Sequence, residues 1–202
     1  MAARCISGGS MIKSIAGILL ASGSGSRFGS DKLLHPLTPG GEPIAVHAAR
    51  HLIQAMPGSV AVVRSANSKL AQLLRAQGLK IAVCRDAALG MGHTLAAGVR
   101  AASAAGGWVV ALADMPGIRP ETIRCVAQSL RDGATIVAPR FRGQRGHPVG
   151  LACRFHAELL ALKGDAGARA IVAGHQDLIT FIDVDDPGVI KDIDTPADLP
   201  GK

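Results

Sequence analysis

The chain has 202 residues, of which 48% are hydrophobic and 18% charged, so it is long enough for one sizeable core and too apolar for a disordered protein. Lys and Arg outnumber Asp and Glu by 22 to 15, but this net charge of +7 is spread along the sequence and is typical of a solvated surface. Aromatic residues make up 2%, which argues against a platform for stacking nucleic-acid bases. No apolar run approaches the ~20 residues of a membrane span. We therefore expect a cytoplasmic protein that binds neither nucleic acid nor membrane.

The N-terminal segment differs from the rest of the chain. Residues 1–12 include a Ser-Gly-Gly-Ser run and predict a disordered extension, with Met11 as a candidate natural start; residues 13–202 are expected to form a single domain. Lys13 and the apolar run after it imitate a signal peptide, but cleavage after Ala21 would remove a predicted strand. The four cysteines lack C-x-x-C spacing and nearby histidines, so free thiols are expected rather than a metal cluster: Cys5, Cys84, Cys125 and Cys153.

The first predicted element is a buried strand at residues 15–21, followed by a run of small residues at 22–26. Small residues let a backbone approach a ligand closely and point its N–H groups outward, which suits a polyphosphate. Arg27 and Lys32 would neutralise such a ligand. The stretch therefore predicts a loop that binds a nucleoside triphosphate; a Gly/Ser-rich turn that binds nothing is the alternative. It is neither a dinucleotide fingerprint nor a Walker loop, because Phe28 replaces the third glycine and Lys32 does not follow a glycine directly.

Alternating helices and strands follow this loop. His47 and His51 are four residues apart on the first helix, but no third ligand lies nearby in sequence, so a surface or packing role is favoured over a metal pair. Asn67 is the candidate cap of the second helix. The predicted elements are a helix at 44–56, a strand at 59–64, a helix at 67–77 and a strand at 79–84.

A glycine turn at residues 90–92 precedes a predicted helix at 94–105. The free N–H groups of a helix N-terminus suit a ribose or base, although a plain capped turn is the alternative. The next strand, 108–113, is continuously apolar, as expected when helices cover both faces of a sheet. It ends at Asp114, where a carboxylate has the position of a metal ligand or, alternatively, of a turn cap. A helix at 120–131 and a strand at 134–139 complete this part.

From residue 140 the alternation loosens. Residues 141–152 are polar and glycine-rich, and the section from residue 140 onward is expected to form an acceptor-binding flap over the sheet. The predicted elements of this part are helices at 154–162 and 166–173, a strand at 178–184 and a short strand at 189–190.

The alternation of strands and helices predicts an α/β protein with a mostly parallel central sheet in a three-layer, Rossmann-like arrangement. In such sheets ligands lie beyond the carboxyl ends of the strands. Both the loop at 22–32 and Asp114 fall at such ends, so the sequence predicts that they share one site.

Several segments together resemble one enzyme family. Residues 19–34 read LLASGSGSRFGSDKLL, which is similar to the signature loop of the MobA/MocA-like nucleotidyltransferases, the branch that includes molybdenum cofactor cytidylyltransferase and guanylyltransferase. These enzymes attach a nucleotide to a phosphorylated acceptor. The further segments occur in the family's order: GMGHTL at 90–95, LADMP at 112–116, RGHPV at 145–149 and DIDTPADL at 192–199.

The resemblance implies roles for individual residues. Arg27, Lys32 and Asp114 would be catalytic, with Arg27 and Lys32 holding the β- and γ-phosphates; Lys32, after a glycine loop, is expected to be a solvent-facing cation. Mg²⁺ would bind Asp114 and Asp194, since alignment with the family favours Asp194 as the second ligand, with Asp192 as the alternative. The acceptor would contact Arg145 and His147, although a buried structural role for His147 is the alternative. The triphosphate-binding set is Leu20, Ala21, Ser22, Gly23, Ser24, Gly25, Ser26, Arg27, Lys32, Gly92 and Thr94.

The resemblance also implies the reaction. An Mg²⁺-dependent enzyme would join a nucleoside monophosphate to the phosphate of molybdopterin or its molybdenum form, release pyrophosphate and supply a molybdoenzyme. CTP should be preferred to GTP, because Ser22 places a CH₂OH group where guanylyl-transferring members have a glycine. Two alternatives stay open: transfer to a sugar- or polyol-phosphate, and a non-catalytic nucleotide-binding or cofactor-delivery protein.

Overall fold

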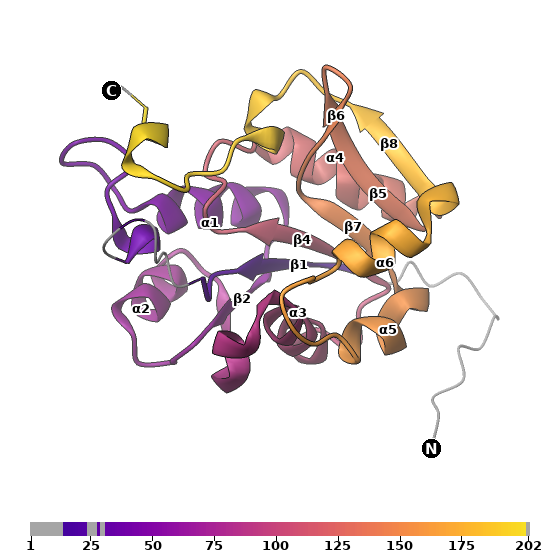
Figure 1. The fold of residues 1–202 in the computed structure, drawn as a ribbon, viewed down its shortest axis with the longest axis horizontal. Helices are drawn as coiled ribbons and strands as arrows, with labels where there is room; N and C mark the ends of the chain where they lie inside the picture. The colour runs from indigo at the N-terminus through magenta and orange to yellow at the C-terminus, as the bar shows by residue number, and fades with distance from the viewer. Residues whose placement is uncertain (1–13, 24–27, 29–30, 201–202) are drawn as a thin grey trace.

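The computed structural model describes residues 14–23, 28 and 31–200 (Figure 1). The predicted extension at 1–12 and the loop residues Ser24, Gly25, Ser26 and Arg27 lie outside the described residues.

A mostly parallel sheet forms the centre of the molecule. Four parallel strands lie side by side in the order β3-β2-β1-β4, and β7 then lies antiparallel between β4 and β5. The edge strand β8 is parallel to β5, and β6 forms a short antiparallel hairpin with β5. The sheet consists of β1 (Ile15–Leu20), β2 (Val60–Val63), β3 (Lys80–Val83), β4 (Gly107–Leu112), β5 (Ile136–Phe141), β6 (Gln144–Arg145), β7 (Val149–Ala152) and β8 (Ile179–Asp183).

Helices cover both faces of the sheet, as the sequence predicts for a three-layer α/β fold. In Figure 1, α1 and α4 lie above the sheet and α3 and α5 below it. The first face carries α1 (Ile44–Ala55), α2 (Lys69–Ala76) and α4 (Pro120–Arg131). The second carries α3 (Met91–Ala101), α5 (His156–Leu160) and α6 (Arg169–Gly174).

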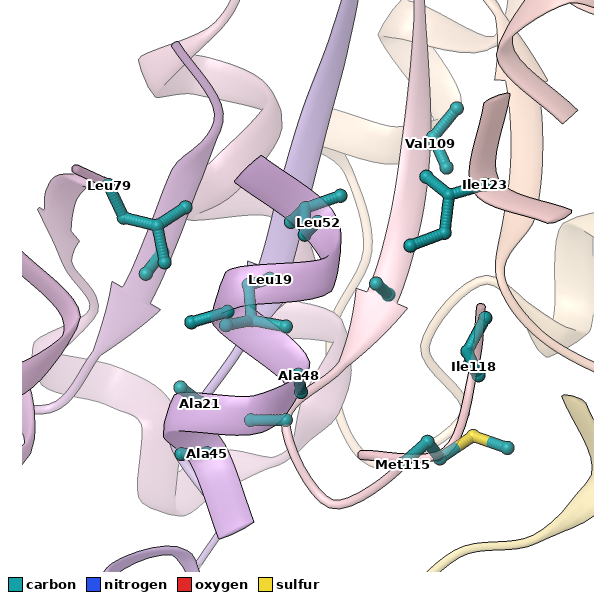
Figure 2. Close-up of a cluster of buried hydrophobic side chains, with 14 of the residues drawn as sticks. Leu19, Ala21, Ala45, Ala48, Leu52, Leu79, Val109, Met115, Ile118 and Ile123 are labelled. Carbon is teal, nitrogen blue, oxygen red and sulfur yellow. The ribbon is translucent and has the colours of Figure 1, made fainter. Parts of the chain in front are cut away.

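The two cores follow from the alternation of side chains along the strands. Leu19 packs into the first core, whereas Ile18 and Leu20 pack into the second. Figure 2 shows Ala45, Ala48 and Leu52 of α1 lying against the strands. Small alanines let the helix axis approach the sheet closely, so that all three side chains are buried.

The second core contains Trp108, the only tryptophan of the chain. Its side chain is fully buried, and its indole N–H donates to the carbonyl oxygen of Ala102 at 3.0 Å. The ring stacks on His156 with centroids 5.6 Å apart. The N–H therefore has the partner that a buried indole needs.

Several predicted boundaries are corrected by local hydrogen bonding. Ser68, not Asn67, caps α2, because the Ser68 hydroxyl accepts from the Ala71 N–H at 3.1 Å. Helix α3 begins at Met91 rather than Thr94 and ends at Ala101. The predicted strand at 189–190 is wrong: Pro187–Ile190 is a 3₁₀ turn, favoured by its leading proline.

The expected flap after residue 140 is wrong for β7, which lies inside the central sheet. Gly150 of this strand packs against Val126 and Leu130 of α4, where a Cβ would approach a side-chain atom of Val126 to 2.9 Å. The glycine that made the segment resemble a loop is therefore required by close helix packing. The predicted helices nearby are also shorter, since Cys153–Phe155 forms a 3₁₀ turn before α5.

A buried carboxylate joins the last part of the chain to α4. Asp186 is 2% exposed, and its Oδ2 accepts from the Arg119 N–H at 2.8 Å and from the Thr122 hydroxyl at 2.6 Å. Its Oδ1 accepts from the Gly188 N–H at 3.0 Å. The carboxylate thus satisfies a free N–H group at the start of the helix, where its negative charge also complements the helix dipole.

Candidate active site

A cavity of about 480 Å³ opens beyond the carboxyl ends of β1 and β4. It brings together Ser22 and Gly23 at the start of the predicted loop, Lys32 at its end, and Asp114, as expected for a parallel α/β sheet. Residues from six separate parts of the chain line it: Leu20, Ser22, Gly23, Lys32, Leu33, Arg64, Ala87, Ala88, Gly90, Met91, Thr94, Leu112, Asp114 and Asp165.

Lys32 is the electrostatic centre of this site. Its Nζ donates to Asp114 Oδ2 and to Asp194 Oδ1, both at 2.9 Å. Burial alone lowers the pKa of the ammonium, but its hydrogen bonds to Asp194 and Asp114 and its attraction to both carboxylates outweigh that effect, so the pKa of Lys32 is raised. The lysine is therefore held charged between two carboxylates.

The prediction that Lys32 faces solvent is wrong, because its side chain is only 10% exposed. It lies in a 3₁₀ turn, Lys32–Leu34, whose next residue, Leu33, belongs to the first core. The packing of Leu33 fixes the turn and directs the lysine inward. Sequence reasoning missed this because the carboxylates that hold Lys32 lie 82 and 162 residues away.

Asp194 is positioned by backbone contacts of its own segment. The Ile193 N–H donates to the Asp114 carbonyl at 2.9 Å, which aligns the two segments. Asp198 then accepts from the N–H groups of Thr195 at 2.7 Å and Asp194 at 3.1 Å. The Thr195 hydrogen bonds are the main cause of the lowered pKa of Asp198. The Asp-Thr-Pro-Ala-Asp segment therefore acts as a capped turn that presents Asp194 to Lys32.

Two hydroxyl groups and one arginine surround the start of the predicted loop. The Ser22 and Thr94 hydroxyls hydrogen-bond each other at 2.7 Å, and both residues are buried. Arg64 Nε donates to the Ser22 carbonyl at 2.6 Å. Sequence analysis missed Arg64, although it directly follows an apolar strand, which is the signal that singled out Asp114.

Gly92 has a structural contact in place of the predicted exposed amide. Its N–H donates to the Gly164 carbonyl at 2.8 Å. Gly90, with φ of +124°, packs so closely against Gly164 and Asp165 that a Cβ would collide with them. These glycines hold the 164–165 loop beside the cavity, whereas Thr94 of the predicted pair lines it.

His147 lies near enough to Asp114 and to Arg145 to be influenced by their charges, and neither His147 nor Arg145 lines the cavity. Arg145 is exposed on β6, whereas His147 is held by its backbone N–H, which donates to the Val189 carbonyl at 2.8 Å. Within the described part of the chain, His147 Nδ1 is buried without a hydrogen-bond partner. Burial lowers the pKa of His147; Arg145 lowers it further, and the charges of Asp114 and Asp192 oppose the shift. The charges of Asp114, Arg145 and Asp192 therefore all influence the pKa of His147.

The residues present suit a small divalent cation. Two carboxylates converge on the Lys32 ammonium, which shows that a positive centre can be shared by Asp114 and Asp194. Mg²⁺ commonly takes one or two carboxylates and completes its coordination with phosphate and water oxygens. Among the described residues, no group of three or more His, Cys, Asp or Glu side chains could hold a metal ion.

Two further expectations concern histidines and membranes. His51 Nδ1 hydrogen-bonds with the Ile118 carbonyl at 2.9 Å, which gives it the packing role expected. None of the described helices has the length and apolar character required to cross a membrane.

The mostly parallel sheet, with a lysine–carboxylate cluster beside a cavity at its carboxyl ends, defines an α/β protein whose candidate ligand site has the position typical of such sheets. Residues 17–178 match the family model of the MobA-like NTP transferase domain, and the chain belongs to that family. This confirms the resemblance found in the sequence.

Individual relatives cover nearly the whole chain. The chain is 31% identical over 192 residues to nicotine blue oxidoreductase of Paenarthrobacter nicotinovorans, covering 90% of this chain and 92% of that protein. It is 27% identical over 195 residues to the purine catabolism protein PucB of Bacillus subtilis, covering 91% and 93%. The crystal structure of Rv0371c of Mycobacterium tuberculosis superimposes with a TM-score of 0.78 at 26% identity, covering 92% and 95%. That protein has also been crystallised with manganese.

Proposed function

We propose that this nucleotidyltransferase joins a nucleoside monophosphate, from CTP in preference to GTP, to the phosphate of molybdopterin or its molybdenum form and releases pyrophosphate. The observation that carries the proposal is the cluster of Lys32, Asp114 and Asp194 beside the cavity. Both reactants are anions, so catalysis requires positive charge at fixed positions more than a strong nucleophile.

In this proposal Asp114 and Asp194 hold Mg²⁺, and the manganese complex of Rv0371c supports a divalent cation. When bound, the cation supplies charge neutralisation at the phosphates. Lys32 donates to the leaving pyrophosphate, a role for which its retained positive charge suits it. Arg27, outside the described residues, is assigned to the same phosphates on the resemblance alone.

The acceptor is proposed to approach from the side of His147 and Arg145. A hollow of about 670 Å³ is lined by Pro116, Gly117 and the 191–193 segment among others, and the hydrogen bond from the Ile193 N–H to the Asp114 carbonyl connects this segment with the cavity. Asp192 lines this hollow and is close enough to His147 to influence its pKa. Arg145 would attract the acceptor phosphate, and the transfer step would take place at Asp114.

The base preference is proposed to depend on Ser22. Its Cβ narrows the base pocket, and its hydroxyl is tied to Thr94, so the side chain cannot easily swing away from a purine. Discrimination by such a steric difference is modest, roughly 1–3 kcal/mol or ~10–200-fold. We expect Ser22→Gly to gain GTP activity and Ser22→Ala, which keeps the Cβ, to retain the CTP preference. Initial rates with both triphosphates test this, and a wild type that favours GTP would reject it.

The decisive experiment measures pyrophosphate release by the purified protein with molybdopterin, MgCl₂ and each triphosphate, together with mass spectrometry of the cofactor product. A cytosine dinucleotide form of the cofactor is the expected product. Release that requires a sugar- or polyol-phosphate instead would assign the acceptor to that alternative. Binding of triphosphate without release under all conditions would indicate a non-catalytic nucleotide-binding or delivery protein.

One observation favours a second candidate. The relative that is 31% identical is named an oxidoreductase, so members similar to this chain are not restricted to nucleotidyl transfer. In that case the cavity would hold a redox nucleotide. Oxidation of NADH or NADPH in the presence of an organic dye, without release of pyrophosphate from any triphosphate, would support this candidate over the first.

A further inference from the structure

A second hollow, of about 640 Å³, lies next to the candidate active site. Arg64 lines both, so the two are neighbours at the carboxyl ends of the strands. We call this second hollow the basic hollow. Its lining comes from the segments after β2 and β3, from one face of α3 and from the end of α5: Arg64, Ser65, Ala66, Val83, Cys84, Arg85, Asp86, His93, Ala96, Ala97, Arg100, Leu160, Leu162 and Lys163.

Positive charge is concentrated in this lining. Four cations, Arg64, Arg85, Arg100 and Lys163, face a single acid, Asp86. In the part of the chain that the structure describes, none of these cations forms an ion pair with a carboxylate. By contrast, Arg50, Arg124 and Arg140 elsewhere on the surface are each paired. Unpaired like charges around one hollow repel each other and favour an anion between them.

The floor of the basic hollow is apolar. Ala96 and Ala97 of α3 and Leu160 and Leu162 near α5 contribute to it, and Val83 at its edge is 41% exposed. A hollow that combines apolar walls with a few convergent polar groups is typical of sites for small organic molecules. Inorganic phosphate alone would leave this floor unused.

Arg64 has a fixed orientation at the boundary. Its Nε donates to the Ser22 carbonyl at 2.6 Å, and its Nη atoms have no partner within the described residues. A guanidinium anchored in this way presents its remaining donors without the full entropic cost of ordering a free arginine.

We propose that the basic hollow binds a phosphorylated organic molecule, whose phosphate lies among Arg64, Arg85, Arg100 and Lys163 and whose organic part rests on the floor of α3 and α5. The position agrees with the rule that parallel α/β sheets bind ligands beyond the carboxyl ends of their strands. The site is separate from the one assigned to the triphosphate, and it stands or falls independently of the transfer reaction.

The test is a titration of the full chain, labelled with ¹⁵N, with phenyl phosphate, compared with inorganic phosphate and with sodium chloride of matched ionic strength. We expect saturable shifts of the Ser65, Arg85 and Arg100 amides. The double variant Arg85→Gln/Arg100→Gln should raise the dissociation constant about tenfold or more, because it removes two charge-assisted contacts. The matched control Arg124→Gln/Arg131→Gln, on the opposite face, should leave it within about twofold.

The outcomes are distinct. Shifts confined to Ser22, Lys32 and Thr94 would place the ligand in the candidate active site and overturn the proposal, whether or not nucleotidyl transfer occurs. Equal affinity for inorganic phosphate would overturn the assignment to an organic phosphate. Shifts that sodium chloride reproduces, or an unchanged affinity in a double variant that retains the wild-type amide spectrum, would show that no such site exists.

Discussion

The molecule divides into a regular part and an irregular part that do different work. From β1 to α4 a strand is followed in turn by a helix, and every strand runs in one direction. From β5 onward the chain reverses in β7, and short helices and 3₁₀ turns connect the strands. The regular part supplies every residue of the cavity lining except Asp165, whereas the irregular part contacts the regular part at a few places: Asp194 on Lys32, Asp186 on α4 and His147 near Asp114. The site therefore forms where the regular part meets a few side chains of the irregular part.

The largest effect on activity is expected at Asp114, where the regular and the irregular part meet. Asp114→Asn should lower the rate of pyrophosphate release by roughly 10²–10³-fold, because it removes charge from the proposed cation site. Asp194→Asn should act in the same direction if the irregular part is essential to the chemistry. Asp177→Asn is the matched control, since Asp177 is exposed and belongs neither to the Lys32 cluster nor to the lining of the cavity or of the acceptor hollow. A folded Asp114→Asn variant of normal rate would contradict the assignment.

Lys32→Met tests whether the cluster with Asp114 and Asp194 also stabilises the contact between the regular and the irregular part. The variant leaves two carboxylates facing each other, and we expect the free energy of unfolding to fall by roughly 1–3 kcal/mol at pH 7. The loss should shrink as the pH falls into the range in which carboxylates are protonated. Urea denaturation measures it, with the exposed Lys69→Met as control. Equal stability of both variants would show that Lys32 serves substrate binding alone.

Asp186→Asn tests a contact between the two parts that lies outside the lining of the candidate active site. All three groups that contact this carboxylate are donors, so an amide must turn its own NH₂ toward a donor in either orientation. We expect a loss of roughly 1–3 kcal/mol in the free energy of unfolding. The neighbouring Asp185→Asn changes an exposed side chain and should have little effect. Thermal denaturation of both variants decides the matter.

The smallest expected effect is a dependence on pH. The pKa of His147 is lowered mainly by burial, so the unfolded chain takes up a proton near pH 6.5 that the folded chain still excludes. The contribution of this residue to stability is complete above that pH and is lost as the pH falls through the folded pKa. His147→Gln should therefore flatten the fall of unfolding free energy on mild acidification. If the variant shows the same slope of unfolding free energy against pH as the wild type, groups other than His147 cause the fall.

The regular part was predictable from the sequence because each of its elements carries a local signal. Helix α4 begins at Pro120, and Asp114 is an acid just after an apolar strand. The irregular part depends on distant contacts. Val149–Ala152 looked like part of a loop because Gly150 is explained only by α4, and Asp194 was located through the family resemblance rather than by its own pattern. The inward direction of Lys32 and the Arg64–Ser22 contact have no local signal.

The stacked pair of Trp108 and His156 provides a fluorescence probe of one face of the sheet. The chain contains no tyrosine, so its near-ultraviolet emission comes almost wholly from this indole, which is buried between the sheet and α5. Loosening of that face would expose the ring to water and move the emission to longer wavelength. The face covered by α1 and α4 has no such chromophore, but its helices contribute to far-ultraviolet dichroism. Because far-ultraviolet dichroism follows the helices of both faces, an emission change that separates from it during denaturation would show that the core around Trp108 does not melt together with the rest of the molecule.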